Sequence, residues 1–469
     1  MTAIQPGLRV CVTGLGVSGV AAARALLDRG ARVLAVDARD DELIREVAAD
    51  LRNRGAEVRL GDAETPVDAD LIVTSPGWRP SQPLLVLAQA QGIEVIGEPE
   101  LAWRLEPVVF PSPDRPPWLG VTGTNGKTTT VGMLASMLSA AGYRTVAAGN
   151  VGTPLVDVVR ADPLYDVIAV EMSSFQLHWS SSICFQASTV LNIAPDHLDW
   201  HGSMEAYAAD KAKIWANGVG CALYNMDDEW SRRLGEKLPD SHNFSVTSED
   251  AEFAIRDGHL HDPWPDGGVL ASVADVELTG QHNLANALAA AGLARLLSFH
   301  SRFEIAPEAV RAGLSAYRPG PHRNQVVATL DDVVYVDDSK ATNAHAAAAS
   351  LSAYHRVVWI AGGLLKGASV DELVVEQRDR LHGVVLIGVD RARIRDALAR
   401  HAPDVPVVEV EATDTGAMTA IVGAARRLAD PGDTVLLAPA AASMDMFRDY
   451  AERGDVFAAA VRRLAEDRV

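Results

Sequence analysis

Short apolar runs alternate with longer stretches of helical periodicity along most of the chain. Residues 8–40 read as an apolar run, a glycine turn, an alanine-rich helical stretch and a second apolar run, and further runs follow at 57–60 and 71–75. In the last third, four apolar runs are separated by helical stretches such as 371–381 and 415–429. Strands that alternate with helices pair in parallel, so the pattern predicts an α/β fold with mostly parallel sheets.

Two proline-containing breaks interrupt this pattern, at 111–117 ("PSPDRPP") and at 317–323 ("YRPGPHR"). The chain has 469 residues, and about 150 residues per domain suggests three domains. We therefore expect a Rossmann-like domain over 1–108, a P-loop ATPase-like domain over 109–319 and a second Rossmann-like domain over 320–469.

Charge and composition argue against nucleic acids and membranes as binding partners. The chain carries 42 Lys and Arg against 62 Asp and Glu, a net charge of -20, which opposes nonspecific nucleic-acid binding. No apolar run approaches the roughly 20 residues that span a bilayer, and the first residues do not resemble a signal peptide. We expect a cytoplasmic protein without membrane insertion. Cys11, Cys184 and Cys221 lack metal-site spacing, so reduced core thiols are the favoured interpretation.

A candidate phosphate loop lies at 120–130, where "GVTGTNGKTTT" turns from a strand into a helix that begins at Lys127. Backbone N–H groups at such a turn bind phosphate. Val121 replaces the first glycine of the strict P-loop pattern, whereas G-K-T completes the rest. The alternative is an ordinary glycine turn with a solvated lysine. We favour ATP binding, with Lys127 between the β- and γ-phosphates and the hydroxyl of Thr128 or Thr129 on Mg²⁺. The residues expected around the phosphates are Gly123, Thr124, Asn125, Gly126, Lys127, Thr128 and Thr129.

The first glycine turn offers a second ligand site. Gly14, Gly16 and Gly19 match G-x-G-x-x-G, and Asp37 ends the next strand, where dinucleotide-binding folds hold a ribose. A nicotinamide cofactor is one reading of this fingerprint. Because nothing downstream resembles a hydride-transfer site, we favour another ligand that carries a diphosphate.

Two candidate metal contacts follow strands of the second domain. Glu171 closes the strand at 167–170, and a carboxylate there suits Mg²⁺, although an exposed strand-end acid is the alternative. His197 lies in "APDHLDWH", whose aspartates and histidines lack a zinc spacing. This histidine is as readily structural as it is a Mg²⁺ or substrate contact.

Further polar residues leave several choices open. Lys211 and Lys213 are two positions apart, so only one of them can face a cleft, and the pattern does not say which. Asn283 and Asn286 share a face at a helix start, as caps or as ligand contacts. In the third domain, two polar turns at strand ends predict a second substrate pocket. The residues of these turns are Asp338, Lys340, Thr342, Asn343, Ser443 and Phe447.

Eight segments resemble the Mur ligase family, in the order in which that family carries them. They are "GVTGTNGKTTT", "AGNVG", "VEMSSFQL", "APDHLDWH", "YAADKAKIW", "GQHNLANALAA", "GPHR" and "DDSKATN". Together with "SPG" at 75–77, "AGGLLKG" and "APAAASMDMF", they are most similar to the branch that joins D-glutamate to UDP-N-acetylmuramoyl-L-alanine. The resemblance implies ATP-dependent amide formation through an acyl phosphate, in peptidoglycan precursor synthesis.

The resemblance also implies roles for individual residues. Lys211 would be carbamylated by CO₂ and would help Thr128, Glu171 and His197 hold a pair of Mg²⁺ ions, with Lys127, Glu171, His197 and Lys211 as the catalytic set. The contacts implied for ATP are Asn283, Arg323 and Asp338, in addition to the phosphate loop. Those for the UDP substrate are Ser18, Asp37, Ser75, Asn150 and His197, with Ala38 at a position where a threonine is often found. Those for D-glutamate are Lys340, Thr342, Lys366, Ser443 and Phe447.

Other classes remain as alternatives. Folylpolyglutamate synthases share "GTNGKT" but not the N-terminal fingerprint. A nucleotide-binding regulator without catalysis would not need Lys127, Glu171 and Lys211. We expect a monomer whose partners are its small-molecule substrates.

Overall fold

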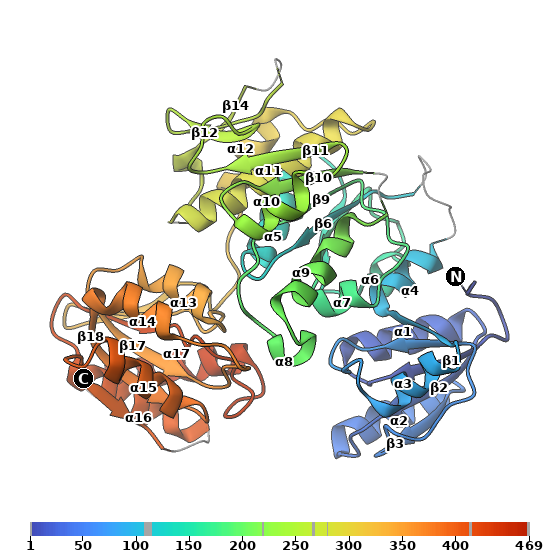
Figure 1. The fold of residues 1–469 in the computed structure, drawn as a ribbon, viewed down its shortest axis with the longest axis horizontal. Coiled ribbons are helices and arrows are strands. Elements are labelled where there is room, and N and C mark those ends of the chain that lie inside the picture. The colour runs from blue at the N-terminus through green and yellow to red at the C-terminus, as the bar shows by residue number, and fades with distance from the viewer. Residues whose placement is uncertain are drawn as a thin grey trace. The chain divides into compact units, whose positions relative to one another are not determined.

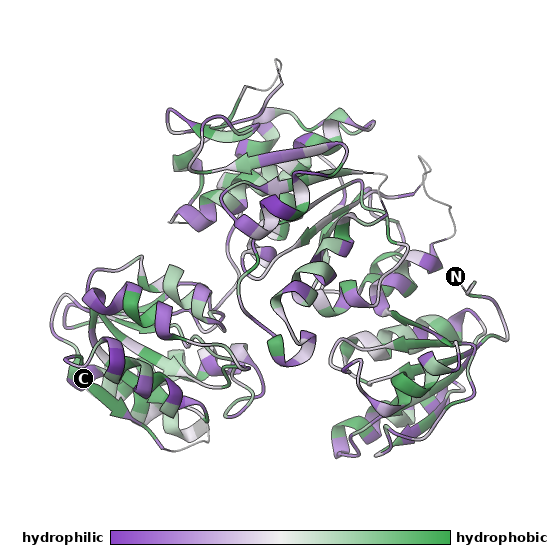
Figure 2. Cartoon of the chain, in the orientation of Figure 1, coloured by the Kyte–Doolittle hydropathy of each residue, from purple (hydrophilic) through white to green (hydrophobic). Residues whose placement is uncertain are grey.

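The computed structural model describes residues 2–106, 115–217, 220–264, 268–278, 280–411 and 415–466. Within these ranges the chain forms three mostly parallel sheets covered by helices, which confirms the predicted α/β class (Figure 1). The strands at the centre of the sheets are buried and predominantly hydrophobic (Figure 2). Residues 111–114 of the first proline-rich break lie outside the described ranges.

The N-terminal sheet has the parallel strand order β3-β2-β1-β4-β5. Its elements are β1 (Arg9–Thr13), α1 (Val17–Asp28), β2 (Arg32–Asp37), α2 (Glu42–Asn53), β3 (Glu57–Leu60), β4 (Leu71–Thr74), α3 (Pro83–Ala90), β5 (Glu94–Gly97) and α4 (Glu98–Leu105). Strand order reverses between β1 and β4, and ligands of doubly wound sheets bind at the carboxyl ends of strands at such a point. Gly14 follows β1 and Ser75 follows β4, so both predicted residues lie there.

The central sheet has the order β14-β13-β12-β11-β10-β9-β6-β8-β7. Its first elements are β6 (Trp118–Thr122), α5 (Lys127–Ala140), β7 (Thr145–Gly149), α6 (Leu155–Val158), β8 (Val167–Glu171), α7 (Ser174–His178), β9 (Ala187–Val190), α8 (Leu198–His201) and α9 (Met204–Ala212). Then come β10 (Cys221–Asn225), α10 (Glu229–Gly235), β11 (Ser241–Ser245), β12 (Phe253–Arg256), β13 (His259–His261), β14 (Val269–Ser272), α11 (Gln281–Phe299) and α12 (Pro307–Ala316). Strand β6 pairs in parallel with β8 and β9, so the loops after these three strands are neighbours.

The C-terminal sheet has the order β15-β16-β20-β17-β18-β19, with only β15 antiparallel among the described strands. Its elements are β15 (Gln325–Leu330), β16 (Val333–Asp337), α13 (Ala344–Leu351), β17 (Val357–Gly362), α14 (Asp371–Gln377), β18 (Leu381–Ile387), α15 (Arg391–His401), β19 (Val407–Glu409), α16 (Met418–Leu428), β20 (Thr434–Leu437) and α17 (Tyr450–Glu466). The four predicted strands are β16, β17, β18 and β20. The edge strands β15 and β19 were not predicted, and the helix expected over 371–381 forms as α14 up to Gln377 and continues as a 3-10 turn over Arg378–Arg380.

Contacts between residues divide the chain into two compact units. The first comprises 1–193 and 205–317 and contains the N-terminal and central sheets; the second comprises 194–204 and 318–469 and contains the C-terminal sheet. The segment Ala194–Met204 therefore packs with the C-terminal sheet although its neighbours in sequence belong to the first unit. No helix in the described part of the chain is long and apolar enough to cross a membrane.

Candidate active site

The phosphate loop forms the predicted strand-to-helix turn between β6 and α5. Gly126 caps α5 in the left-handed region, at φ 83°. A Cβ atom on this residue would lie 2.2 Å from Oδ1 of Asn286, so both the backbone angle and the close packing of α11 require glycine. The loop is therefore held between β6 and the start of α11.

Asn192 fixes the shape of this loop. It follows β9, the neighbour of β6, and its Oδ1 accepts a hydrogen bond from the backbone N–H of Asn125 at 2.9 Å. Its Nδ2 donates to the carbonyl of Asn125 at 3.1 Å, and its own carbonyl accepts from the N–H of Thr124 at 2.9 Å. Asn192 was not predicted as a site residue. A polar residue directly after an apolar strand is the signal that could have identified it.

Two lysines converge on the loop. Lys127 donates from Nζ to the carbonyls of Gly123 at 2.8 Å and Thr124 at 2.9 Å, and Lys211 donates to the same Gly123 carbonyl at 2.9 Å. Lys211 is 1 % exposed and lies 4.6 Å above the ring of Tyr207, whose hydroxyl is 3.1 Å from Oγ1 of Thr124. Two cationic side chains therefore lie at one carbonyl of the loop.

The structure decides between the two lysines that the sequence left open. Lys213 lies beyond α9, where its Nζ pairs with Asp210 at 2.8 Å and donates to the carbonyl of His178 at 3.1 Å. Lys211 is therefore the lysine that faces the phosphate loop.

Glu171 ends β8 and is buried rather than exposed. Its Oε1 accepts a hydrogen bond from Nδ2 of Asn150 at 2.9 Å, whereas its Oε2 is buried and has no hydrogen-bond partner among the described residues. A buried carboxylate oxygen without a partner is unfavourable unless a cation or a donor satisfies it. One strand away from the phosphate loop, this oxygen fits a Mg²⁺ ligand.

The asparagines at the start of α11 do not cap the helix, because Gly280 is its N-cap residue. Instead Asn286 is buried against the phosphate loop, where its Oδ1 accepts from the hydroxyl of Thr130 at 3.3 Å. Its Nδ2 donates to Oδ1 of Asn283 at 3.2 Å. Asn286 thereby links the predicted nucleotide contact Asn283 to the loop.

The fingerprint turn of the N-terminal sheet brings its predicted residues together. Ser75 donates from Oγ to the carbonyl of Gly14 at 2.8 Å. The buried carboxylate of Asp37 accepts from the N–H of Leu15 at 2.6 Å and from the N–H and guanidinium of Arg39. Burial alone would raise the pKa of Asp37, but these hydrogen bonds lower it overall, so the carboxylate is ionised. Ser18 lies in the first turn of α1, the helix that follows this glycine turn.

In the second unit, three predicted site residues bind the carboxylate of Asp196. Lys366 pairs with its Oδ1 at 3.2 Å, Asn343 donates to its Oδ2 at 3.4 Å, and the N–H of His197 donates to Oδ1 at 2.9 Å. Both His197 and Lys366 have left-handed backbone angles, φ 54° and 51°. The sequence pattern around Asp196 did not distinguish this residue from its neighbours.

The turn after β16 contains the other predicted site residues of the segment "DDSKATN". Burial raises the pKa of Asp338 to about 6, although its Oδ1 accepts from the N–H of Asn324 at 3.1 Å and Arg323 acts to lower the pKa. The Nζ of Lys340 lies 3.8 Å from the ring centre of Tyr450, and the N–H of Thr342 donates to the carbonyl of Lys340 at 2.9 Å.

The turn after β20 carries Ser443 and Phe447, both buried, and the carbonyl of Ser443 accepts from the N–H of Phe447 at 2.9 Å. Arg453 joins this turn to the one after β16. It donates to the hydroxyl of Ser339 at 2.9 Å, to the carbonyl of Ser339 at 2.8 Å and to the carbonyl of Ala441 at 3.1 Å. Arg453 was not predicted, because it lies in α17, outside every motif that resembles the family.

The predicted metal contacts are divided between the two units. Thr128, Glu171 and Lys211 belong to the first unit, whereas His197 belongs to the second. The predicted D-glutamate contacts all belong to the second unit.

Models of Mur ligase domains match the chain in three regions. They are described as "Mur ligase MurD-like, N-terminal domain" over residues 8–97, "Mur ligase middle domain" over 121–294 and "Mur ligase, glutamate ligase domain" over 322–441.

Two curated relatives align with nearly the whole chain. Proteins named UDP-N-acetylmuramoylalanine--D-glutamate ligase from Thermobifida fusca and Mycolicibacterium smegmatis are 55% and 46% identical to the chain. The first alignment covers 98% of this chain and 99% of the relative, and the second covers 98% and 97%.

Solved structures share the fold at low identity. A pseudomurein peptide ligase type C from Methanothermus fervidus has a TM-score of 0.60, and UDP-N-acetylmuramate-alanine ligase MurC from Thermotoga maritima has 0.58. Each is 18% identical to this chain. Each alignment covers 98% of this chain and 100% of the solved chain. With domain models that match more than half of its length and full-length relatives at 55% identity, the chain belongs to the Mur ligase family.

Proposed function

We propose that this protein is an ATP-dependent ligase that joins D-glutamate to UDP-N-acetylmuramoyl-L-alanine, in the cytoplasmic synthesis of peptidoglycan precursors. The full-length relatives named for this reaction support the choice of substrates. The observation that carries the chemistry is the unpartnered Oε2 of Glu171, buried one strand from a loop on which Lys127 and Lys211 converge. That arrangement suits a magnesium nucleotide.

The reaction needs an activated carboxylate, because oxide is a poor leaving group. Transfer of the γ-phosphoryl group of ATP to the L-alanine carboxylate gives an acyl phosphate and ADP. The amine of D-glutamate then attacks the acyl carbon, phosphate leaves, and the amine loses a proton. Both steps bring anions together, so the positive charge of Lys127 and the loop N–H groups stabilise the transition state by offsetting this repulsion.

Mg²⁺ would supply further positive charge at the phosphates, held by Thr128, Glu171, His197 and Lys211. Carbamylation of Lys211 by CO₂ would replace a buried cation with an anion. The burial of Lys211 beside the loop supports this role. The carbamate would be an anion that can pair with Mg²⁺, whereas the unmodified ammonium pairs with the Gly123 carbonyl. Two Mg²⁺ ions are proposed.

The remaining proposed contacts are grouped by the ligand that they bind. Ser18, Asp37, Ser75, Asn150 and His197 are proposed for the UDP substrate, and Asn283, Arg323 and Asp338 for ATP. Lys340, Thr342, Lys366, Ser443 and Phe447 are proposed for D-glutamate. The proposed domains are 1–108, 109–319 and 320–469, and the proposed state is a monomer.

The test is phosphate release by the purified protein with ATP, Mg²⁺ and UDP-N-acetylmuramoyl-L-alanine, with each amino acid offered in turn. We expect release only when both cosubstrates are present, and with D-glutamate alone among the amino acids. Release with a folate substrate and L-glutamate would favour the folylpolyglutamate synthase alternative. Nucleotide binding without release under any combination would favour a noncatalytic regulator.

A further inference from the structure

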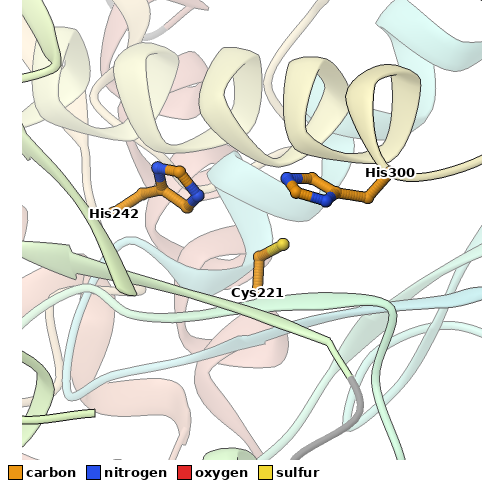
Figure 3. A group of neighbouring side chains, drawn as sticks. All are labelled: Cys221, His242 and His300. Carbon is orange, nitrogen blue, oxygen red and sulfur yellow. The ribbon is translucent and has the colours of Figure 1, made fainter. Parts of the chain in front are cut away.

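We propose that Cys221, His242 and His300 form a Zn²⁺ site at the end of α11 that lies away from the phosphate loop. Each residue offers one ligand atom, and the three atoms lie within 4.8 Å of one another. Figure 3 shows the thiol and both imidazole rings directed toward a shared space. The site is separate from the residues that the proposed ligase reaction uses.

Sheet register explains how these residues meet. Strands β10 and β11 pair in parallel, with Leu223 opposite His242. Cys221 is two residues from Leu223, so its side chain lies on the same face as those of Leu223 and His242. Helix α11 packs on both strands, and His300 is its C-cap residue. The fold thus brings together residues that are 21 and 58 positions apart, 221 to 242 and 242 to 300.

His242 is oriented as a metal ligand. Its Nδ1 lies 2.6 Å from Oε2 of Glu252, which leaves Nε2 for a metal. Glu252 is itself fixed, because its Oε1 accepts from Nδ2 of Asn243 at 3.2 Å and its N–H donates to Oδ1 of Asn243 at 3.0 Å. A carboxylate on the second ring nitrogen is the arrangement that sets the tautomer of zinc-bound histidines.

Burial and surroundings also suit a metal. Cys221 is 5 % exposed and the side chain of His242 is 21 % exposed, whereas His300 is exposed and leaves a route from solvent. The ring of Trp264 lies 6.0 Å from that of His242 and stacks on Phe299 at 3.7 Å, which gives the site an apolar border. Such a border limits competition from water.

The ligand types select the ion. One thiolate and two imidazoles favour Zn²⁺ over Mg²⁺ or Ca²⁺, which prefer oxygen ligands. In a tetrahedral zinc site the ligand atoms lie about 3.3–3.8 Å apart, so only side-chain rotation is needed to close this group around an ion. A water molecule would complete the fourth position.

A second cluster in the chain serves as a contrast. His382, Asp430 and Asp433 also bring ligand atoms within 4.8 Å of one another. There the guanidinium of Arg356 lies against all three, at 3.1 Å from Nδ1 of His382, 3.4 Å from Asp430 and 3.0 Å from Asp433. Because a cation already lies among these ligands, His382 provides a matched control for metal binding.

The test is titration of the untagged, chelator-treated full chain with Co²⁺ as a spectroscopic probe, and with Zn²⁺ against a chromophoric chelator. We expect a thiolate-to-cobalt charge-transfer band that saturates at one equivalent, and displacement of Co²⁺ by Zn²⁺. The proposed Mg²⁺ ligands include no thiolate, so this band separates the two sites. It also appears whether or not the protein proves to be a ligase.

Variants locate the ligands. Cys221→Ser should abolish the band, and His300→Ala should weaken Zn²⁺ binding at least 100-fold without endangering the fold, since His300 is exposed. Glu252→Gln should weaken binding by about 10- to 100-fold. His382→Ala should bind as the unaltered chain does. A chain that binds Co²⁺ without a thiolate band, or binds Zn²⁺ equally well after both Cys221→Ser and His300→Ala, would overturn the proposal.

Discussion

The guanidinium of Arg453 donates to both oxygens of Ser339, to the hydroxyl at 2.9 Å and to the carbonyl at 2.8 Å. Its third bond, to the carbonyl of Ala441, holds the turn after β20 beside the turn after β16. Burial lowers the pKa of Arg453 to about 9, and Asp445 and Asp337 oppose this shift. The structure thus keeps a fully buried arginine where the turns after β16 and β20 meet.

Arg453→Lys should raise the KM for D-glutamate by about tenfold or more, because one ammonium cannot reproduce three bonds of fixed geometry. The KM for the UDP substrate should stay within about twofold, since Ser18, Asp37, Ser75 and Asn150, which are proposed to contact it, lie in the first unit. Steady-state kinetics with each substrate varied in turn measures the difference. Equal impairment for all three substrates would reduce Arg453 to a general role in stability.

Lys211→Ala should be nearly inactive, because it removes the carbamate that the proposed mechanism requires. Acetate or formate should restore part of the activity by placing a carboxylate near the vacated position. Depletion of CO₂ should lower the activity of the unaltered chain, and bicarbonate should restore it. Insensitivity to CO₂ together with failed rescue would contradict carbamylation. Lys213→Ala is the matched control, because that lysine pairs with Asp210 away from the loop.

Lys366→Ala should lower kcat/KM for D-glutamate by roughly 30- to 1,000-fold, which corresponds to about 2–4 kcal/mol for one buried charged contact. The removed ammonium is the one now paired with Asp196, and the carboxylate of the substrate would compete for it. Kinetics against the variant Lys237→Ala, an exposed lysine of the first unit, provides the comparison. An unchanged kcat/KM for D-glutamate would show that Lys366 does not contact this substrate.

Glu98 should make stability depend on pH. Its Oε1 accepts from the N–H of Val156 at 2.7 Å, and burial raises its pKa to about 7 from an ordinary 4.5. The folded state therefore retains a proton that the unfolded state releases, so this group's contribution to stability is lost as pH rises from about 4.5 to 7.

Urea unfolding of the unaltered chain and of Glu98→Gln measures this effect. Relative to the variant, the unaltered chain should lose about 3 kcal/mol of unfolding free energy between about pH 5 and pH 8. A difference that is constant over this range would show that Glu98 is ionised throughout.

Sequence patterns predicted the features that depend on neighbouring residues. The glycine loop before Lys127 and the acid at the end of β8 follow from local periodicity and turn chemistry, and both elements form as expected. Asn192 and Arg453 could not be recognised in this way, because their roles depend on which strands are neighbours in the sheet. The same limit hid the Cys221 cluster, whose members come from two strands and a helix end.

The choice between Lys211 and Lys213 needed the structure for another reason. Periodicity shows that two such residues point apart, but only packing shows which direction leads to the loop. The edge strands β15 and β19 were missed because they are only partly buried and lack a continuous apolar run.

The segment Ala194–Met204 makes the second unit discontinuous in sequence. A fragment that starts at Arg318 would contain the whole C-terminal sheet but would lack Asp196, the partner of Lys366. Such a fragment would carry an incomplete set of charges, and its affinity for an amino acid would not represent that of the intact chain. A circular permutation or domain exchange that treats the last third as an autonomous module would need to transplant these eleven residues, 194 to 204, as well.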